Sequence, residues 1–126
     1  MRIYVAGKFE EKEAVRAVQA SCRAMGWKIT HDWTHEVGLP AGSTADEVQR
    51  FHARCALEDL RGAISADVVV VLLHPAGKGL WVELGAALAM GVPVIAVGDS
   101  NCVFLDLPEV IRCTKFTPDL VKKVVV

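Results

Sequence analysis

The sequence carries little net charge and contains no long hydrophobic run, and each absence excludes a class of protein. The formal net charge is −1 over 126 residues, so nothing indicates a basic surface for nucleic acid or for an anionic membrane. No apolar run approaches the roughly 20 residues that a bilayer-spanning helix needs. We therefore expect neither nucleic acid nor a membrane as a partner.

The sequence also lacks cysteine pairs with the spacing of metal ligands. Its four cysteines are scattered: Cys22, Cys55, Cys102 and Cys113. The opening MRIYVAG predicts a strand followed at once by charge, rather than a secretory signal. These features predict free thiols, a cytoplasmic protein and no bound metal.

Apolar residues are abundant, at 52% of the chain, which suits one domain over residues 1–126 with a substantial core. The segment 67–97 organises the rest. Branched apolar runs at 68–73 and 92–97 are bounded by Gly and Pro, as in strands buried on both faces of a parallel sheet. Between them we predict a loop at 74–79 and a helix at 80–90 that ends at Gly91.

The remaining chain continues the alternation of strands and helices. Further strands are predicted at 2–6, 27–31 and 110–113. Helices are predicted at 10–25 and at about 45–66, the second capped by Ser43 or Thr44 and interrupted near Gly62. Residues 102–105 predict a short edge strand or a buried loop. The order of elements predicts an α/β fold, a three-layer flavodoxin-like or Rossmann-like sandwich of about five mostly parallel strands.

Glu83 is the first candidate for chemistry. It falls in the first turn of the predicted helix 80–90, at the carboxyl end of a strand, where ligands of open α/β sheets bind. The positive end of the helix dipole favours an ionised carboxylate there, which can act as a nucleophile or a general base. Alternatively, the acid only complements the dipole.

Two glycine-bearing loops are expected near Glu83. Gly7, in the turn after the first strand, permits close approach of a ligand to the backbone. Tyr4 before it is either a core residue or a hydroxyl that holds Glu83. The loop HPAGKG lacks the spacing of a Walker loop and of a dinucleotide fingerprint, and its Lys78 would otherwise be a solvated lysine.

A second carboxylate is available near the end of the long helix. Either Glu58 and Asp59 form a solvent-facing pair, or Asp59 points across the cleft as the second carboxylate. Cleavage of a glycosidic bond requires two carboxylates, one that attacks or stabilises the sugar and one that handles the proton of the leaving group.

The loop 32–43 is too long to be a simple connection. Trp33 could stack on a planar base, and Asp32 or His35 could hydrogen-bond to the edge of that base, so we expect this loop to cover the base. The alternatives are a surface loop with a partly buried Trp33, and a metal site formed by His31, Asp32 and His35.

Together these residues resemble the nucleoside 2-deoxyribosyltransferase family. The matching segments are IYVAGKF, EDLRGAISADVVVVLL and GLWVELGAALAMGVPVIAV. The last is similar to the family's G-x-x-x-E-[IL]-G-x-A-x-A-x-G-x-P-V-[IL] signature. The family includes nucleoside 5′-monophosphate N-glycosidases, which hydrolyse the same bond. At the position of Gly77 the transferases carry an acid and those hydrolases a serine.

The resemblance implies a role for each matching residue. Glu83 matches the nucleophile, which attacks the anomeric carbon and holds a glycosyl-enzyme ester. Asp59 matches the acid that helps to protonate the base, and Tyr4 matches the tyrosine that orients the nucleophile. The expected substrate-binding residues are Gly7, Lys8, Phe9, Asp32, Trp33, Gly77, Lys78 and Gly79.

The implied function is cleavage or transfer at the N-glycosidic bond of a 2′-deoxyribonucleoside, without metal or cofactor. One alternative is a monophosphate N-glycosidase, which Lys78 near a 5′-phosphate would favour. Another is a non-catalytic nucleotide-binding module. A homo-oligomer is also expected, because family members assemble around their sites and the two long helices carry surplus apolar residues. The residues proposed for a two-fold interface are Leu80, Trp81, Leu84 and Leu88.

Overall fold

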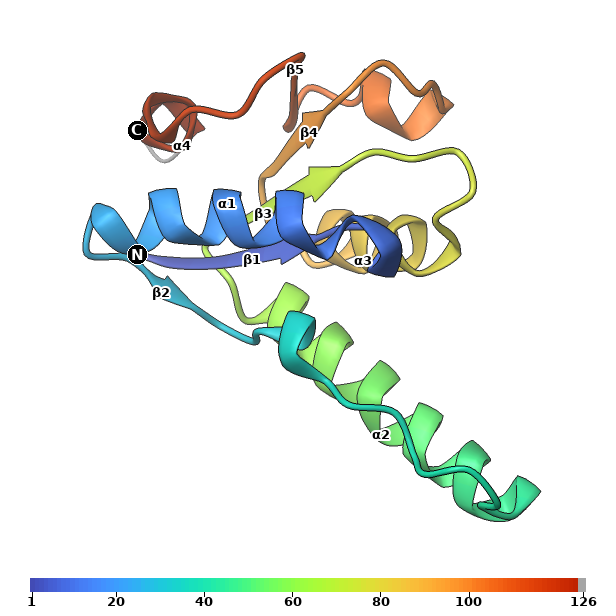
Figure 1. The fold of residues 1–126 in the computed structure, drawn as a ribbon. Helices are drawn as coiled ribbons and strands as arrows, with labels where there is room; N and C mark the ends of the chain where they lie inside the picture. The colour runs from blue at the N-terminus through green and yellow to red at the C-terminus, as the bar shows by residue number, and fades with distance from the viewer. Residues whose placement is uncertain (125–126) are drawn as a thin grey trace.

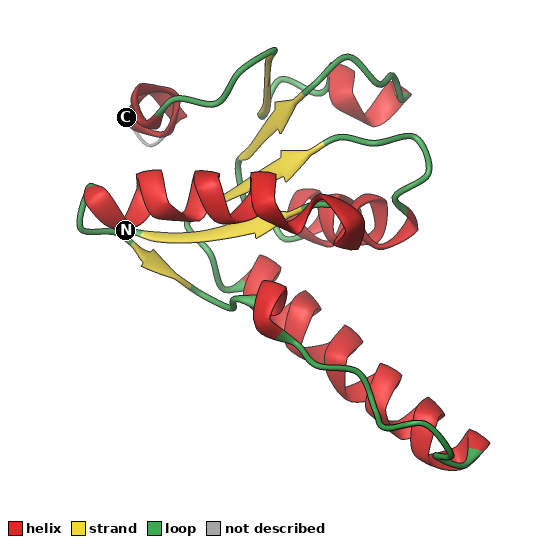
Figure 2. Ribbon diagram, viewed as in Figure 1, coloured by secondary structure: helices red, strands yellow, loops and turns green. Residues whose placement is uncertain are grey.

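Five parallel strands form the central layer of the molecule (Figures 1 and 2). The computed structural model describes residues 1–124. The strands are β1 (Arg2–Ala6), β2 (Lys28–Ile29), β3 (Val68–Leu72), β4 (Val94–Val97) and β5 (Val110–Cys113). Their order is β2-β1-β3-β4-β5, and every neighbouring pair is parallel. This flavodoxin-like order confirms the predicted fold class and places the topological switch point between β1 and β3.

Helices cover both faces of this sheet. The α-helices are α1 (Lys12–Ala24), α2 (Ala45–Ile64), α3 (Lys78–Ala89) and α4 (Pro118–Val124), and the 3-10 turns are η1 (Phe9–Glu11), η2 (Trp33–His35) and η3 (Val103–Asp106). Helices α1 and α4 pack on one face of the sheet, and α2 and α3 pack on the other. None of the helices in residues 1–124 is both long and apolar enough to cross a bilayer.

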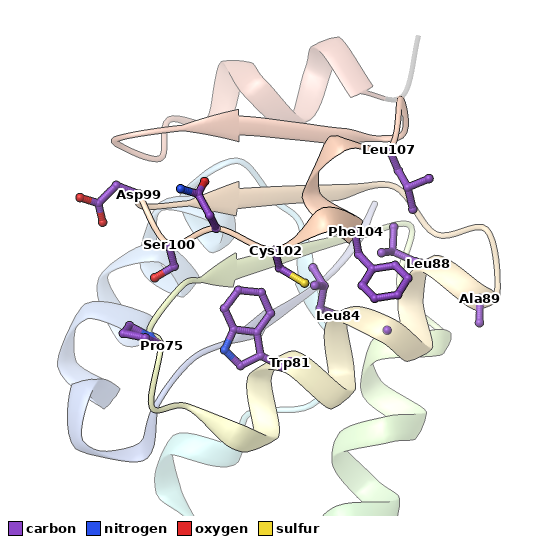
Figure 3. A pocket seen from close by; sticks show the side chains of 12 residues that line it. Pro75, Trp81, Leu84, Leu88, Ala89, Asp99, Ser100, Cys102, Phe104 and Leu107 are labelled. Carbon is purple, nitrogen blue, oxygen red and sulfur yellow. The ribbon is translucent and has the colours of Figure 1, made fainter.

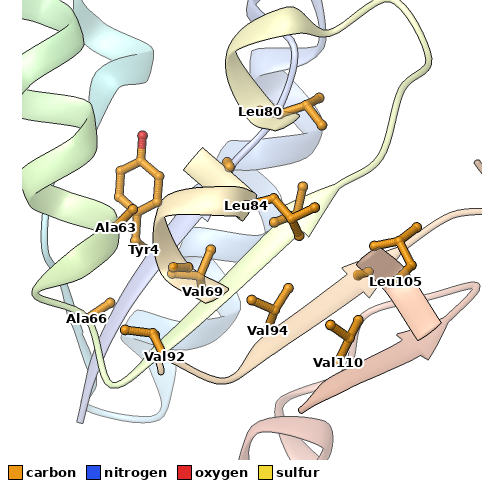
Figure 4. Close-up of a cluster of buried hydrophobic side chains, with 14 residues drawn as sticks. Tyr4, Ala63, Ala66, Val69, Leu80, Leu84, Val92, Val94, Leu105 and Val110 are labelled. Atoms are coloured by element: carbon orange, nitrogen blue, oxygen red, sulfur yellow. The ribbon is translucent and has the colours of Figure 1, made fainter. Parts of the chain in front are cut away.

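Alternation along the strands divides the core into two clusters. On β1, Ile3 and Val5 join the cluster under α1 and α4, whereas Tyr4 and Ala6 join the cluster under α2 and α3. Figure 4 shows this second cluster, with the Tyr4 hydroxyl pointing away from the apolar side chains. All five residues of β3 are buried, as the apolar run predicts.

Three local predictions are wrong in detail. Helix α3 begins at Lys78, directly after a turn in which Gly77 N donates to His74 O at 3.1 Å. Glu83 therefore lies in its second turn rather than its first. Gly62 does not interrupt α2, which continues to Ile64. Of the two alternatives for residues 102–105, the edge strand is wrong, because β5 occupies that edge of the sheet; residues 103–106 form a 3-10 turn in which Leu105 is buried.

The first turns of α2 extend away from the sandwich (Figure 1). Thr44 caps this helix, since its hydroxyl accepts from Glu47 N at 3.1 Å and its own amide donates to the Glu47 carboxylate at 2.9 Å. Residues 36–43 run back along α2 and form a small cavity with its Val48 and Phe51. Of the loop 32–43, which we expect to cover the base, only η2 therefore remains at the sheet.

Candidate active site

A pocket of about 380 Å³ lies where β1 and β3 end, a volume typical of small-molecule sites. Its walls are the loop after β1, the loop before α3 and the side of α2. The lining residues are Gly7, Lys8, Phe9, Glu10, Trp33, Asp59, Ala76, Gly77, Lys78, Gly79, Leu80 and Glu83. The pocket thus brings together the expected site residues apart from Tyr4, which lies behind Glu83, and Asp32, which lies elsewhere.

Glu83 is held by one hydrogen bond and leaves one oxygen free. The side chain is buried, and its Oε1 accepts from the Tyr4 hydroxyl at 2.6 Å. Its Oε2 would lie 3.6 Å from a Cβ on Gly79, so the absence of a side chain there keeps the pocket open beside this oxygen. The carboxylate therefore has a fixed orientation and one oxygen available to a ligand.

Tyr4 is both a core residue and the partner of Glu83. Its ring is fully buried on the α2 and α3 side of the sheet. A Cβ on Gly62 would come within 2.8 Å of Tyr4 Cδ1 and 2.9 Å of His31 Cβ. Glycine at this position thus lets α2 pack against Tyr4 and His31 together.

The pKa of Glu83 is raised to about 7: burial is the largest cause, the hydrogen bond from Tyr4 lowers the value, and the charge of Asp59 raises it. The expectation that the helix dipole favours the ionised form is therefore wrong, because Glu83 lies beyond the first turn and desolvation dominates. The pKa of Tyr4 is raised well above its usual value by burial, by the charges of Glu83 and Asp59 and by the bond to Glu83. Tyr4 therefore stays a neutral donor.

Asp59 faces the same pocket from α2. Burial raises the pKa of Asp59 to about 6; nearby His31 lowers it, whereas the charges of Glu36 and Glu58 raise it. Two carboxyl groups with pKa values near neutrality share one pocket, so the pair as a whole takes up a proton close to physiological pH.

Trp33 is anchored to the sheet and also lines the pocket. Its Nε1 donates to Val5 O at 2.8 Å, and its ring lies 6.5 Å from that of Phe9, centroid to centroid. Trp33 is therefore a partly buried side chain that packs on the sheet, and it also forms part of the pocket wall.

Asp32 lies outside the pocket and stabilises the turn η2. Its carboxylate accepts from Thr34 N at 3.0 Å and from Thr34 Oγ1 at 2.6 Å, and also contacts Gln19 and Arg23. Burial raises the pKa of Asp32, but these hydrogen bonds outweigh it and leave the value at about 2. Asp32 is thus committed to local structure rather than to a ligand.

The histidines of this region diverge. His35 Nε2 lies 3.3 Å from Asp32, whereas His31 Nε2 lies 3.4 Å from Asp59 and 3.8 Å from Glu58. His31, Asp32 and His35 therefore do not converge on a metal, and no cluster of three such ligands occurs among residues 1–124.

Sequence patterns missed two residues that shape the site. Gly62 contacts Tyr4, and His31 contacts Asp59, although neither residue lines the pocket. The only signal for Gly62 was a glycine inside a helical pattern, which indicates close approach of another element. His31 was considered only as a possible metal ligand with Asp32 and His35, and its contact with Asp59 was not expected.

A larger cavity of about 1020 Å³ lies on the other side of α3 (Figure 3). Trp81, Leu88 and Phe104 line its apolar wall, and residues 99–102 form its polar rim. Among its lining residues, Asp99 is the only carboxylate, and none of them lines the pocket of Glu83. Paired acids occur only in the smaller pocket, so we place the candidate chemistry there.

Comparisons with known proteins identify a related sequence family and a related fold. The family model described as nucleoside 2-deoxyribosyltransferase matches residues 3–109, a range that contains all the pocket residues. Among solved structures, the Clostridium botulinum CMP N-glycosidase BcmB is similar over 100% of both chains, at 18% sequence identity and a TM-score of 0.61. At this identity the similarity shows a shared fold. No curated protein sequence matches the chain.

Proposed function

Because this chain belongs to the nucleoside 2-deoxyribosyltransferase family, we propose that it cleaves the N-glycosidic bond of a 2′-deoxyribonucleoside with Glu83 as nucleophile. The observation that carries this proposal is the Glu83 carboxylate, bound by Tyr4 at 2.6 Å in a pocket that also contains Asp59. A positioned nucleophile and a second carboxyl group are the two parts that a double-displacement glycosidic reaction needs.

The reaction begins with attack of Glu83 Oε2 on the anomeric carbon. The carbon–nitrogen bond breaks, its electron pair goes to the base, and the protonated Asp59 supplies a proton to the leaving nitrogen. The product is an ester between the sugar and Glu83. In the second step a free base or a water molecule attacks the same carbon, the ionised Asp59 takes the proton that this acceptor loses, and the ester bond to Glu83 breaks, which gives transfer or hydrolysis.

The raised pKa values of Asp59 and Tyr4 suit their roles as proton donor and as neutral hydrogen-bond donor to Glu83. An acid with a pKa of about 6 is a better proton donor near neutrality than an ordinary aspartic acid, which is almost fully ionised there. Tyr4 stabilises the ionised form of Glu83 that must attack, because it donates to that carboxylate.

A nucleoside 5′-monophosphate is the second candidate substrate. Lys8 and Lys78 line the same pocket, and Lys78 opens α3, whose unpaired amides and dipole favour an anion. The two lysines together would suit a 5′-phosphate, and hydrolysis would then be the expected outcome. This alternative keeps the same nucleophile and the same acid.

The test is a panel of deoxynucleosides and their 5′-monophosphates, each incubated with and without free adenine. We expect released base in every productive reaction, exchange of bases when adenine is present, and a sugar adduct on Glu83 by mass spectrometry. Glu83→Gln should abolish release, whereas Glu109→Gln, at an exposed position, should not. Near-normal turnover in Glu83→Gln would overturn the mechanism, and binding without release across the whole panel would favour a non-catalytic module.

A further inference from the structure

We propose that His31 is a positioning residue for Asp59: it holds one carboxylate oxygen so that the other faces the leaving base. The inference rests on the proposed function. His31 Nε2 lies 3.4 Å from Asp59 Oδ1. Asp59 itself lines the pocket, whereas His31 does not, so the imidazole acts on the substrate only through Asp59.

His31 and Tyr4 are both positioned by their close packing against Gly62 of α2. Thr30 Oγ1 donates to Gly62 O at 2.7 Å and fixes the end of the β2 segment against α2. Both His31 Cβ and the ring of Tyr4 lie against Gly62, each within 2.9 Å of where a Cβ would be. Glu83 and Asp59 therefore each have a supporting side chain, Tyr4 for Glu83 and His31 for Asp59.

His31 also counteracts the effect of neighbouring carboxylates on the pKa of Asp59. Glu58 on α2 and Glu36 after η2 both raise the pKa of Asp59, and Asp59 in turn raises the pKa of Glu83 across the pocket. Of the other nearby groups, Arg54 binds Glu36 at 3.3 Å and Cys55 donates to that same carboxylate. His31 is the group next to Asp59 that lowers its pKa.

Removal of the imidazole should therefore change the titration of Asp59 and the fate of the leaving group. In His31→Gln we expect the pKa of Asp59, followed by carboxyl ¹³C NMR, to rise by about half a unit or more. The pH limb of kcat that belongs to Asp59 should move up with it. We expect kcat to fall about tenfold or more for bases that leave poorly, with little change in KM.

The matched control is His35→Gln, whose imidazole contacts Asp32 outside the pocket. This variant should leave the Asp59 titration and the pH profile unchanged. An Asp59 titration that is identical in folded His31→Gln and wild type would overturn the proposal, and so would an equal loss of kcat for good and poor leaving groups.

The NMR measurement needs no turnover, so it separates this proposal from the proposed function. A wild-type protein that releases no base refutes the function, while the Asp59 titration still decides whether His31 acts on this carboxylate. If His31→Gln does not fold, Asp59→Asn gives the second test. The imidazole ¹⁵N resonances of His31 should shift in that variant and not in Asp46→Asn, and an unchanged His31 spectrum would refute the contact.

Discussion

At the scale of single residues, Glu83 combines a functional position with a cost in stability. A carboxyl group whose pKa rises from 4.5 to about 7 on folding binds more proton in the folded than in the unfolded state between those values. The stability it contributes is complete below pH 4.5 and is lost as the pH rises through about 7. The folded state is thus least favoured where the ionised nucleophile is needed.

Glu83→Gln should therefore stabilise the protein at alkaline pH. The amide keeps an oxygen that accepts from Tyr4 and cannot ionise, so the variant should exceed wild type by about 2 kcal/mol in the free energy of unfolding at pH 8. The difference should vanish toward pH 4. Urea unfolding at several pH values measures it, with Glu109→Gln as the exposed control. A constant difference across this range would mean that Glu83 does not titrate as the burial predicts.

At the scale of elements, the approach of α2 to the sheet decides the geometry of both carboxylates. Gly62 makes this approach possible because a Cβ would overlap Tyr4 Cδ1 at 2.8 Å and His31 Cβ at 2.9 Å. Tyr4 is fully buried and cannot move aside. A single methyl group on α2 would thus disturb the supports of Glu83 and Asp59 together.

Gly62→Ala should lower stability by about 1–3 kcal/mol, as overpacking does, although alanine is the better helix former. It should also reduce base release. Gly85→Ala in α3 is the matched control, because nothing lies within 4 Å of its Cβ position, and it should gain roughly 0.5–1 kcal/mol from helix propensity. Thermal unfolding of both variants, with turnover, measures the contrast. Equal effects at the two glycines would contradict the packing argument.

These elements also show what local sequence can predict. Apolar runs identified β3 and β4, and the glycine after β1 identified the loop that lines the pocket, since these signals are local in the chain. The contact of Tyr4 with Glu83 spans 79 residues; the residues alone left it as one of two alternatives, and the family resemblance favoured it. Contacts of Gly62 with Tyr4 and His31 depend on how closely α2 packs, which no local pattern records. The course of residues 36–43 along α2 likewise depends on tertiary packing, which the local sequence does not record.

At the scale of the whole molecule, the exposed apolar residues are not the ones that the sequence predicted for a two-fold interface. Leu80 and Leu84 are buried in the molecule's own core and cannot form an interface. Trp81 and Leu88 are partly buried against that core. The exposed large apolar residues of α2 are Leu57 and Ile64, with exposed fractions of 47% and 40%, and those of α3 and its C-cap are Val82 and Met90, with 61% and 64%. The first turns of α2 also stand away from the sandwich (Figure 1), which leaves that helix open to a partner.

We therefore propose a homo-oligomer whose interface includes the exposed face of α3, as an apolar surface of this kind suits an isologous contact. Sedimentation at micromolar concentration should give at least twice the 13.6 kDa of one chain. Val82→Asp should reduce the mass toward that of the monomer, because a charge buried in an apolar interface is strongly unfavourable. Met25→Asp is the matched control, since Met25 is 40% exposed at the end of α1 on the opposite face of the sheet. A wild-type protein that sediments as a monomer, or a loss of assembly in Met25→Asp alone, would contradict an interface on α3.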